Sequence, residues 1–287
     1  MIVWLDGRWL DADDATVSIR DRGFLMADGV YETCRLFEGG YFRLAAHLDR
    51  LERSGSILGV PIPPAGELTT IAYGLAHRNA IIDGSLRIIV TRGTGARTTV
   101  LLTLEPVAPD WRERAARGWN LITARSRRPP TDSVPAELKT LGRPWALLAR
   151  REAAAAGADD ALLLSTGGHI AEGTAWNVFW RSGTTLCTPS LEVGVLDGIT
   201  RATLLAIAPA QGLVVSEGRW SRAALEDAEE AFATMSSLGI VPIRRIDDRS
   251  FDPASPAAHA LADAYWRTVA REAAEHRVRF LHGGAAS

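Results

Sequence analysis

The chain carries a single lysine, Lys139, among 32 basic residues, so 31 of them are arginine. Both residue types can supply solvated surface charge, but only the lysine amine can lose its proton and attack a carbonyl carbon. Lys139 is therefore either a lysine that escaped replacement by arginine or a nucleophile that the chemistry of the protein requires. The motifs around it have to decide between these two interpretations.

Six short motifs follow one another along nearly the whole chain. They are DRGFLMADGVYETCR (21–35), HLDRL (47–51), ELKTL (137–141), AEGTAWNVFW (171–180), LDGITR (196–201) and AFATMSSLGIVPI (231–243). In this order and spacing the chain resembles the fold type IV enzymes that depend on pyridoxal 5′-phosphate (PLP). That group includes branched-chain and D-amino-acid aminotransferases, (R)-amine transaminases and aminodeoxychorismate lyase. The resemblance implies two α/β domains with PLP in the cleft between them, and a homodimer.

PLP chemistry requires an amine for a Schiff base, a carboxylate beside the pyridine nitrogen, donors for the phosphate and apolar surfaces for the ring. The resemblance makes Lys139 the Schiff-base lysine and the acid–base catalyst. It makes Glu172 the partner of the pyridine nitrogen, which a carboxylate can keep protonated. Without the resemblance, Glu172 would be interpreted as a solvated residue that follows a hairpin.

The resemblance also assigns the residues that hold the cofactor. Arg50 becomes the main phosphate cation, although taken alone it is an ordinary arginine on a helix surface. Ile199 and Thr200 begin a predicted helix after Gly198, and the amides at a helix N-terminus suit a phosphate independently of any resemblance. The other predicted contacts are Ser236 and Ser237 for the phosphate, Leu196 for one face of the ring and Asn177 for hydrogen-bonded support.

On the substrate side, Tyr31 matches an aromatic residue that lines the pocket in this family. The loop RGTGAR (92–97) resembles the loop that supplies a carboxylate-binding arginine in D-amino-acid aminotransferases. A bidentate guanidinium–carboxylate pair would orient an amino acid, with Arg97 as first candidate and Arg35 as second. For both arginines, an ordinary ion pair is the alternative.

Three positions depart from the family pattern. Thr99 stands where the D-amino-acid enzymes have a histidine, and Ala27 replaces the usual glycine of a GDG motif. Arg143, after the lysine, looks more like aminodeoxychorismate lyase, as do NVFWRSG (177–183) and the RGTGAR loop. These departures leave the reaction less defined than the cofactor.

The predicted function is ping-pong transamination between an amino acid, favouring a D-amino acid, and a 2-oxo acid. One alternative is an aminodeoxychorismate lyase that releases 4-aminobenzoate and pyruvate; another is a branched-chain or (R)-amine transaminase. A non-catalytic protein that binds PLP is the alternative from another class. The complete set of lysine, glutamate and phosphate ligands argues against the last.

Hydrophobic periodicity and turn residues predict the elements that must position these side chains. The predicted fold class is α/β (α+β), with a small N-terminal domain (1–108), a connector (109–117) and a larger PLP-binding domain (118–287). Helices are expected at 43–59, 66–81, 144–156, after Gly198 and at 256–277; strands at 86–93 and 98–107, in a hairpin over 160–180, and at 213–217 and 229–243. The helix at 43–59 combines a leucine stripe with a polar stripe of Arg43, His47 and Arg50.

Composition bounds the partners. The chain has 287 residues, a net charge of −2 and 47% hydrophobic residues, which gives no reason to expect nucleic acid or a membrane as partner. Cys34 and Cys187 lie far apart without zinc-ligand spacing, so neither a disulfide framework nor a metal site is expected. We see no signal peptide and no spanning segment, and a cytoplasmic location is the expectation.

Overall fold

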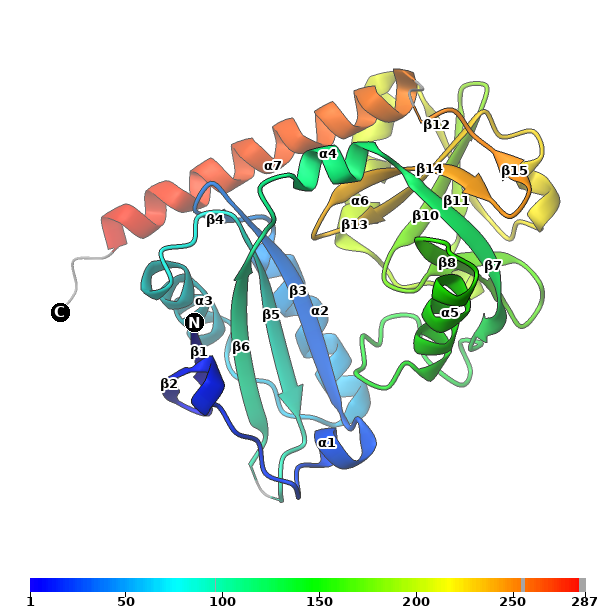
Figure 1. The fold of residues 1–287 in the computed structure, drawn as a ribbon. Coiled ribbons are helices and arrows are strands. Elements are labelled where there is room, and N and C mark those ends of the chain that lie inside the picture. The colour runs from blue at the N-terminus through cyan, green and yellow to red at the C-terminus, as the bar shows by residue number, and fades with distance from the viewer. Residues whose placement is uncertain (96, 254–255, 284–287) are drawn as a thin grey trace. The chain divides into compact units, whose positions relative to one another are not determined.

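The computed structural model describes residues 1–95, 97–253 and 256–283, and it contains two compact units (Figure 1). The first unit comprises Met1–Ala108, Glu137–Gly142 and the chain from Arg267 onward. The second comprises Pro109–Ala136 and Arg143–Trp266. Each unit combines a β-sheet with helices, so the predicted mixed α/β class is confirmed.

The first unit contains a six-stranded antiparallel sheet in the order β2-β1-β6-β5-β3-β4. Its strands are β1 (Ile2–Leu5), β2 (Arg8–Asp11), β3 (Gly29–Phe37), β4 (Gly40–Tyr41), β5 (Gly84–Thr91) and β6 (Thr99–Pro106). Its helices before residue 108 are the 3₁₀ turn η1 (Ala12–Asp14), α1 (Arg22–Met26), α2 (Leu44–Leu58) and α3 (Ala65–Arg78). The predicted helices at 43–59 and 66–81 and the two predicted strands are confirmed to within a few residues.

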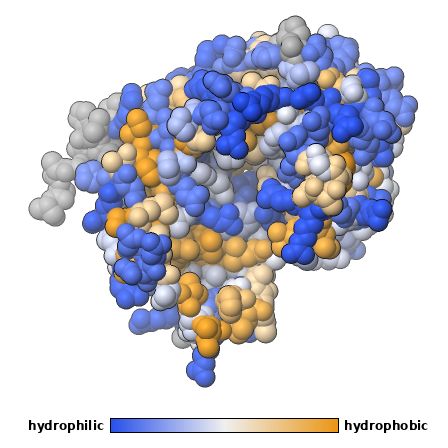
Figure 2. Space-filling view, in the orientation of Figure 1, coloured by the Kyte–Doolittle hydropathy of each residue, from blue (hydrophilic) through white to orange (hydrophobic). Residues whose placement is uncertain are grey.

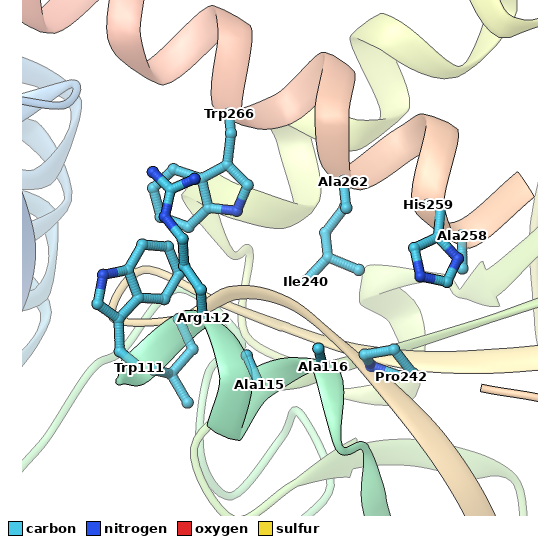
Figure 3. Close-up of a pocket in the computed structure, with 11 residues that line it drawn as sticks. Trp111, Arg112, Ala115, Ala116, Ile240, Pro242, Ala258, His259, Ala262 and Trp266 are labelled. Carbon is cyan, nitrogen blue, oxygen red and sulfur yellow. The ribbon is translucent and has the colours of Figure 1, made fainter. Parts of the chain in front are cut away.

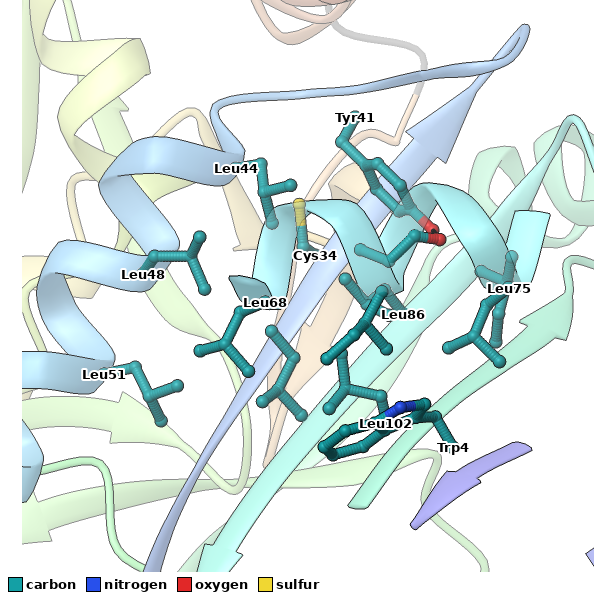
Figure 4. Packing of buried hydrophobic residues seen from close by; sticks show 14 of the residues in the cluster. Trp4, Cys34, Tyr41, Leu44, Leu48, Leu51, Leu68, Leu75, Leu86 and Leu102 are labelled. Carbon is teal, nitrogen blue, oxygen red and sulfur yellow. Dashed lines mark hydrogen bonds between the residues drawn. The ribbon is translucent and has the colours of Figure 1, made fainter. Parts of the chain in front are cut away.

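Helices α2 and α3 pack on one face of this sheet and bury a leucine-rich core (Figure 4). Strand β5 shows the alternation that produces such a face: Leu86 and Ile88 are buried, whereas Arg87 between them is exposed. The leucine stripe predicted for α2 supplies Leu44, Leu48 and Leu51 to the core. The side chains of β3 and β5 that lie on the opposite face are consequently available for other contacts.

The polar stripe of α2 differs from the sequence interpretation. His47 and Arg50 are buried, at 1% and 3% exposure, instead of lying on the helix surface. Burial of charged groups requires partners. Glu32 on β3, itself fully buried, supplies them, and this cluster is described below.

The segment around Lys139 folds with the first unit, whereas the sequence placed residues 118–287 in one domain. Main-chain hydrogen bonds explain this difference. The Tyr31 N–H donates to the Lys139 carbonyl over 3.1 Å, and the Leu141 N–H donates to the Gly29 carbonyl over 3.0 Å. Residues 137–142 thus follow the edge of β3 at the point where that strand begins.

The second unit is built on a nine-stranded sheet in which β9 also pairs with β10, so six strands, β10-β13-β14-β7-β8-β9, close into a ring. The strands are β7 (Trp119–Arg128), β8 (Asp160–Ser165), β9 (Ile170–Gly173), β10 (Asn177–Ser182), β11 (Thr185–Pro189), β12 (Val214–Gly218), β13 (Glu230–Met235), β14 (Gly239–Ile246) and β15 (Arg249–Ser250). The helical segments are α4 (Trp111–Ala116), α5 (Pro144–Ala155), η2 (Leu191–Val193), α6 (Ile199–Ile207), η3 (Ala208–Gln211) and η4 (Arg222–Leu225). The predicted helices at 144–156 and after Gly198 are confirmed.

Three elements differ from the predicted ones. The expected connector at 109–117 contains helix α4, because Trp111 and Ala115 are four residues apart and bury the same helical face. The strand expected through 171–180 is broken: β9 ends at Gly173 and β10 begins at Asn177, opposite Glu172. The closing helix α7 (Pro256–Gly283) extends beyond the predicted end at residue 277 and contributes residues to both units.

In the described residues no helix has the length and apolarity needed to cross a membrane.

Candidate active site

Lys139 is held between a strand and a helix of the first unit. Its N–H donates to the Ser54 hydroxyl on α2 over 3.1 Å, and its carbonyl accepts from Tyr31 on β3. Its amine nitrogen lies 4.8 Å from the centre of the Tyr31 ring, within the range of a cation–π contact. The two predicted site residues Lys139 and Tyr31 are therefore neighbours.

Arg87 is a second cation on the same ring. Its guanidinium carbon lies 4.7 Å from the centre of the Tyr31 ring. Arg87 pairs with Thr33 across β3 and β5, so its side chain stands on the same sheet face as that of Tyr31, two residues away. Arg87 was not among the predicted site residues, because the register of β3 against β5 that brings it beside Tyr31 cannot be recognised from the local sequence.

On β3, one residue after Tyr31, the Glu32 carboxylate binds an arginine and a histidine. Arg50 donates to it twice, from Nε over 2.6 Å and from Nη2 over 2.9 Å, and the His47 Nδ1 lies 2.8 Å away. The N–H of Thr33 adds a donor at 3.1 Å. Two nitrogens of Arg50, the predicted phosphate cation, are thus directed at a buried carboxylate of this chain.

The charges of this cluster shift the ionisation of its members. Burial alone would raise the pKa of Glu32, but the cations Arg50 and Lys139, with His47, hold it well below its ordinary value. Burial lowers the pKa of His47, and the adjacent Glu32 opposes that shift only in part. The Glu32 carboxyl is therefore ionised, and the His47 ring is neutral at neutral pH with Nδ1 as the donor to Glu32.

The two arginines predicted for the substrate carboxylate have different environments. Arg35 is buried, and its Nη2 donates to Asp83 over 3.1 Å, which favours a structural ion pair. Arg97 is exposed on the loop between β5 and β6. Residue 96 in that loop lies outside the described residues. Within the first unit, Arg87 is the arginine that shares an aromatic contact with Lys139.

In the second unit, Glu172 on β9 is fixed by two donors. The Nε of Arg128 donates to one carboxylate oxygen over 2.8 Å, and the N–H of Leu196 donates to the other over 2.9 Å. Arg128, at the end of β7, is 3% exposed, and its guanidinium carbon lies 5.3 Å from the Trp145 ring centre. Sequence reasoning missed Arg128, which stands 44 residues before Glu172 in an arginine-rich stretch.

Asn177 connects Glu172 to the start of α6. The two residues face each other across β9 and β10, and the Asn177 amide donates to the Leu196 carbonyl over 2.9 Å. Gly198 precedes α6 without a side-chain cap, and a Cβ atom there would overlap the Asn177 amide oxygen. Residue 198 must therefore be glycine for the turn 196–198 to pass this close to Asn177. The first main-chain amides of α6 receive no hydrogen bond from a capping side chain.

The hydroxyl residues predicted for the phosphate lie on neighbouring elements. Thr200 is buried, with its hydroxyl 3.5 Å from that of Tyr265. Ser236 and Ser237 are half-buried in the turn that follows β13. Thr234 on β13 is paired with Asn177 of the neighbouring strand β10. Its buried hydroxyl has no hydrogen-bond partner in the described part of the chain. Strand pairing thus groups Glu172, Asn177 and Thr234, and hydrogen bonds add Leu196 and the start of α6.

The profile of the class IV amino-transferases matches residues 29–246, which contain the residues described above from Tyr31 to Ser237. The chain belongs to the class IV aminotransferases. Enzymes of this class use PLP, so the cofactor expected from the motifs is confirmed at the level of the family.

Relatives of this class IV aminotransferase have several activities. This chain is 34% identical over 259 residues to a putative branched-chain-amino-acid aminotransferase of Methanocaldococcus jannaschii, and the match covers 87% of this chain and 89% of that protein. It is 33% identical to the aminodeoxychorismate lyase of Bacillus subtilis (87% and 88% covered) and 29% identical to a D-alanine aminotransferase of Bacillus licheniformis (89% and 92%). Its fold matches a branched-chain aminotransferase of Thermoproteus uzoniensis solved with norvaline, with a TM-score of 0.88 at 30% identity over 96% of this chain and 97% of that one.

The residues of this class IV aminotransferase fit PLP on grounds of the structure itself. The unpartnered Thr234 hydroxyl, the uncapped start of α6 and the fixed Glu172 carboxylate lie on connected elements of the second unit. Within the first unit, the amine of Lys139 lies over the Tyr31 ring. Among the residues that the structure describes, no group of three or more His, Cys, Asp or Glu could hold a metal ion.

A separate hollow in the second unit has no part in this chemistry (Figure 3). It lies between α4, β14 and α7, and its walls include Trp111 and Trp266, whose rings are 4.6 Å apart. Arg112 lies over both rings. None of the predicted catalytic or cofactor residues lines it.

Proposed function

We propose that this class IV aminotransferase carries PLP on Lys139 and moves an amino group between an amino acid and a 2-oxo acid. The environment of Lys139 supports this proposal most directly. Its main-chain N–H donates a hydrogen bond to Ser54, and its side-chain amine lies over the Tyr31 ring. PLP, when bound, supplies the aldehyde that reacts with amines and the electron-withdrawing ring. The Lys139 amine would hold the cofactor and then move the substrate proton.

A single-lysine chain allows a sharp test of this role. Borohydride reduction of the protein with PLP should leave one pyridoxyl group per chain, on the peptide that contains Lys139. The other primary amine is the N-terminus, which digestion and mass spectrometry separate from it. Lys139→Ala should lose the adduct and lower turnover by about 10⁴-fold or more, since it removes both the covalent anchor and the proton carrier. An adduct confined to the N-terminus, or turnover that survives in Lys139→Ala, contradicts the proposal.

Glu172 is proposed to face the pyridine nitrogen, with Arg128 as the residue that orients it. The two hydrogen bonds of Glu172 come from Arg128 and from the main chain at Leu196, so its carboxylate is fixed in direction. A fixed carboxylate keeps the ring nitrogen protonated, which increases the electron demand of the cofactor. Leu196, adjacent to Glu172, is proposed to pack on one face of the ring.

The phosphate is proposed to bind at the start of α6, with contributions from Ile199, Thr200, Ser236, Ser237 and Arg50. Main-chain amides and the helix dipole favour an anion there. Because Arg50 is paired with Glu32, these amides should carry more of the phosphate affinity than the sequence alone suggests. Gly198→Ala should therefore weaken PLP binding much more than binding of pyridoxal, which has no phosphate. Equal weakening of both ligands would remove the phosphate from this position.

The preferred substrate is proposed to be a D-amino acid, with the carboxylate held by arginine. Arg97 follows the loop pattern of D-amino-acid aminotransferases, and Arg87 shares the Tyr31 ring with Lys139. Replacement of the arginine that binds the carboxylate, by Arg87→Ala or by Arg97→Ala, should raise KM for D-alanine far more than KM for a simple (R)-amine. A change for D-alanine in one variant alone identifies the carboxylate ligand.

The aminodeoxychorismate lyase activity is the second candidate, favoured by Arg143, whose Nη1 donates to the Thr174 carbonyl over 3.0 Å, and by the lyase relative. Purified protein should be given D-alanine, L-leucine or an (R)-amine with 2-oxoglutarate, and in parallel aminodeoxychorismate. Conversion of D-alanine supports the preferred proposal. Release of 4-aminobenzoate supports the lyase, and conversion of L-leucine supports a branched-chain enzyme.

The protein is also proposed to form a homodimer. Helix α1 and the segment before it expose large apolar side chains, namely Val17, Ile19, Phe24, Leu25 and Met26, at 45% to 79% exposure. Figure 2 shows apolar side chains gathered at the end of the molecule where Figure 1 places α1. A second copy of the chain would cover them. Sedimentation should give twice the mass of the chain, and Phe24→Asp with Met26→Asp should shift the sedimenting species toward the monomer.

The cytoplasmic location stays a prediction that cell fractionation can check.

A further inference from the structure

The turn that joins β9 to β10 carries the residues assigned to the cofactor nitrogen and to its support. Glu172 and Asn177 are paired across these two strands, at the two ends of the segment 173–176. The Gly173 N–H donates to the Trp176 carbonyl over 2.7 Å and closes the turn. The conformation of this turn therefore sets the direction in which the main chain presents both side chains.

Asp160, on the neighbouring strand β8, binds both polar side chains of the turn. The Thr174 hydroxyl lies 2.9 Å and 2.8 Å from its two carboxylate oxygens, and the Trp176 indole N–H donates to one of them over 3.0 Å. Asp160, Thr174 and Trp176 are each 4% exposed. Hydrogen bonds to an ionised acceptor in a buried environment are stronger than those between neutral groups. The Asp160 carboxylate thus holds the turn against β8.

The groups around the Asp160 carboxylate in the described residues are all donors. Besides Thr174 and Trp176, the N–H of Ala161 donates to it over 2.8 Å, and the Arg150 guanidinium lies 3.6 Å away. Arg150 also donates to the Thr174 oxygen over 3.1 Å, which directs the hydroxyl proton toward Asp160. An asparagine at this position would turn an NH₂ group toward one of these donors. A carboxylate can accept hydrogen bonds from all of them.

Packing also restricts the turn. A Cβ atom at Gly173 would overlap the Trp176 indole, so the ring closes directly over the main chain at that point. The Trp119 ring meets the same indole edge-on, with the ring centres 5.9 Å apart. The indole is therefore held by ring contacts as well as by its hydrogen bond to Asp160.

We propose that Asp160 is a positioning residue for Glu172, on which it acts through the turn 173–176. The inference deepens the proposed function and rests on the role of Glu172 there. Arg128 and the Leu196 N–H hold the Glu172 carboxylate at its tip, whereas Asp160 holds the main chain that follows it. Misplacement of a reacting or contacting group by about 1 Å can cost about 100-fold in rate. Asp160 contributes to the chemistry through the alignment of Glu172 and not by contact with the substrate.

The ring nitrogen of the cofactor reports on this role. In protein loaded with PLP that carries ¹⁵N in its ring, the ¹⁵N chemical shift distinguishes the protonated from the unprotonated nitrogen. Glu172→Gln should move the signal toward the unprotonated value. Asp160→Asn should move it in the same direction by a smaller amount, because Glu172 keeps its charge and loses its alignment. Asp248→Asn, the same change at an exposed position, is the matched control and should leave the signal in place.

Turnover separates alignment from stability. Rates are expressed per Lys139 that forms the pyridoxyl adduct, so that loss of folded protein does not lower them. Asp160→Asn should lower kcat about tenfold and change KM for the amino donor by less than about twofold. In the Glu172→Gln background the same change should leave kcat unaltered, because the carboxylate that Asp160 aligns is gone. A purely structural role would change kcat by the same factor in both backgrounds or in neither.

The smaller ¹⁵N shift together with the kcat loss confined to the Glu172 background supports the proposal. If the signal moves in Glu172→Gln but not in Asp160→Asn, or if kcat changes equally in both backgrounds, the inference is wrong and the proposed function stands. If the signal stays in place in Glu172→Gln as well, the proposed role of Glu172 fails and the inference fails with it. Should Asp160→Asn not fold, Thr174→Val decides, because it removes a hydrogen bond to Asp160 and retains the size of the side chain. An unmoved signal in Thr174→Val then overturns the inference.

Discussion

Each unit pairs a glutamate with a buried arginine, but the two pairs are built differently. In the first unit, Glu32 receives two hydrogen bonds from Arg50, with further donors from His47 and Thr33. In the second unit, Glu172 receives a single hydrogen bond from Arg128 and one from the main chain of Leu196. Both arginines are 3% exposed, so burial of the cation does not distinguish the pairs.

The difference lies in what each carboxylate has left to bind. Glu32 accepts four hydrogen bonds from the protein and has no exposed side-chain surface, whereas Glu172 accepts two hydrogen bonds in the described residues and its side chain retains 13% exposure. On the arginine side, the Nη1 of Arg128 has no hydrogen-bond partner in that part of the chain. A carboxylate that accepts several hydrogen bonds from the protein stabilises its own unit and acts on neighbouring charges electrostatically. A carboxylate that accepts fewer of them can also contact a ligand. The two glutamates therefore differ both in the number of hydrogen bonds that the protein donates to them and in the exposure of the carboxylate.

The largest effect is expected on stability in the first unit. Glu32→Gln should lower the free energy of unfolding by about 3–5 kcal/mol, because it leaves the buried Arg50 charge without a counter-ion. Denaturant unfolding measures this change, with Glu52→Gln as the exposed control. A loss below about 1 kcal/mol would mean that water or a neighbouring group replaces the carboxylate, and the contrast between the two pairs would fail.

Glu172→Gln should show the opposite balance. We expect turnover to fall about 100-fold, which corresponds to about 2.7 kcal/mol, because a neutral amide cannot keep the cofactor nitrogen protonated. The free energy of unfolding should fall by only about 1–2 kcal/mol, since Gln still accepts a hydrogen bond from Arg128. Single-turnover kinetics and denaturant unfolding of the same preparation separate these two effects. An unchanged rate would remove Glu172 from the proposed chemistry.

The sequence could predict what the motifs carry and could not predict what only strand pairing creates. The approach of Glu172 to Asn177 was hidden because the sequence suggested one continuous strand, whereas the chain reverses between Gly173 and Asn177. The polar residues of α2 were predicted to be solvated because helical periodicity does not show that a buried strand supplies a counter-ion. Arg87 and Arg128 were not found, because nothing in their local sequence distinguishes them from the other arginines.

Arg128→Met should give an intermediate effect. Loss of the guanidinium frees one oxygen of Glu172 and removes a fixed direction, while the hydrogen bond from Leu196 remains. Turnover should fall about tenfold, less than in Glu172→Gln, because an orienting contact is lost and the charge is kept. The combined variant Arg128→Met/Glu172→Gln should be no slower than Glu172→Gln alone. Additive losses would show that Arg128 acts independently of Glu172.

The smallest effect concerns His47 and appears only with pH. Burial lowers the pKa of His47 in the folded protein, whereas a histidine in the unfolded chain titrates near about 6.5. The unfolded state therefore binds the extra proton first, so stability is fully present above pH ~6.5 and is lost as pH falls below that value, by at most about 1.4 kcal/mol per pH unit. Glu32, whose pKa is lowered in the fold, should add a second loss of stability below its unfolded pKa of ~4.3, where its carboxylate is protonated only in the unfolded chain.

In His47→Asn, whose amide can still donate to Glu32, the loss of stability between pH 6.5 and 5 should shrink while the loss below pH ~4.3 persists. Unfolding measured from pH 8 to 3.5 checks both intervals, with the exposed His77→Asn as control. An unaltered slope between pH 6.5 and 5 in His47→Asn would mean that His47 is already charged in the fold. The cluster of Glu32, His47 and Arg50 would then carry a net positive charge instead of a balanced one.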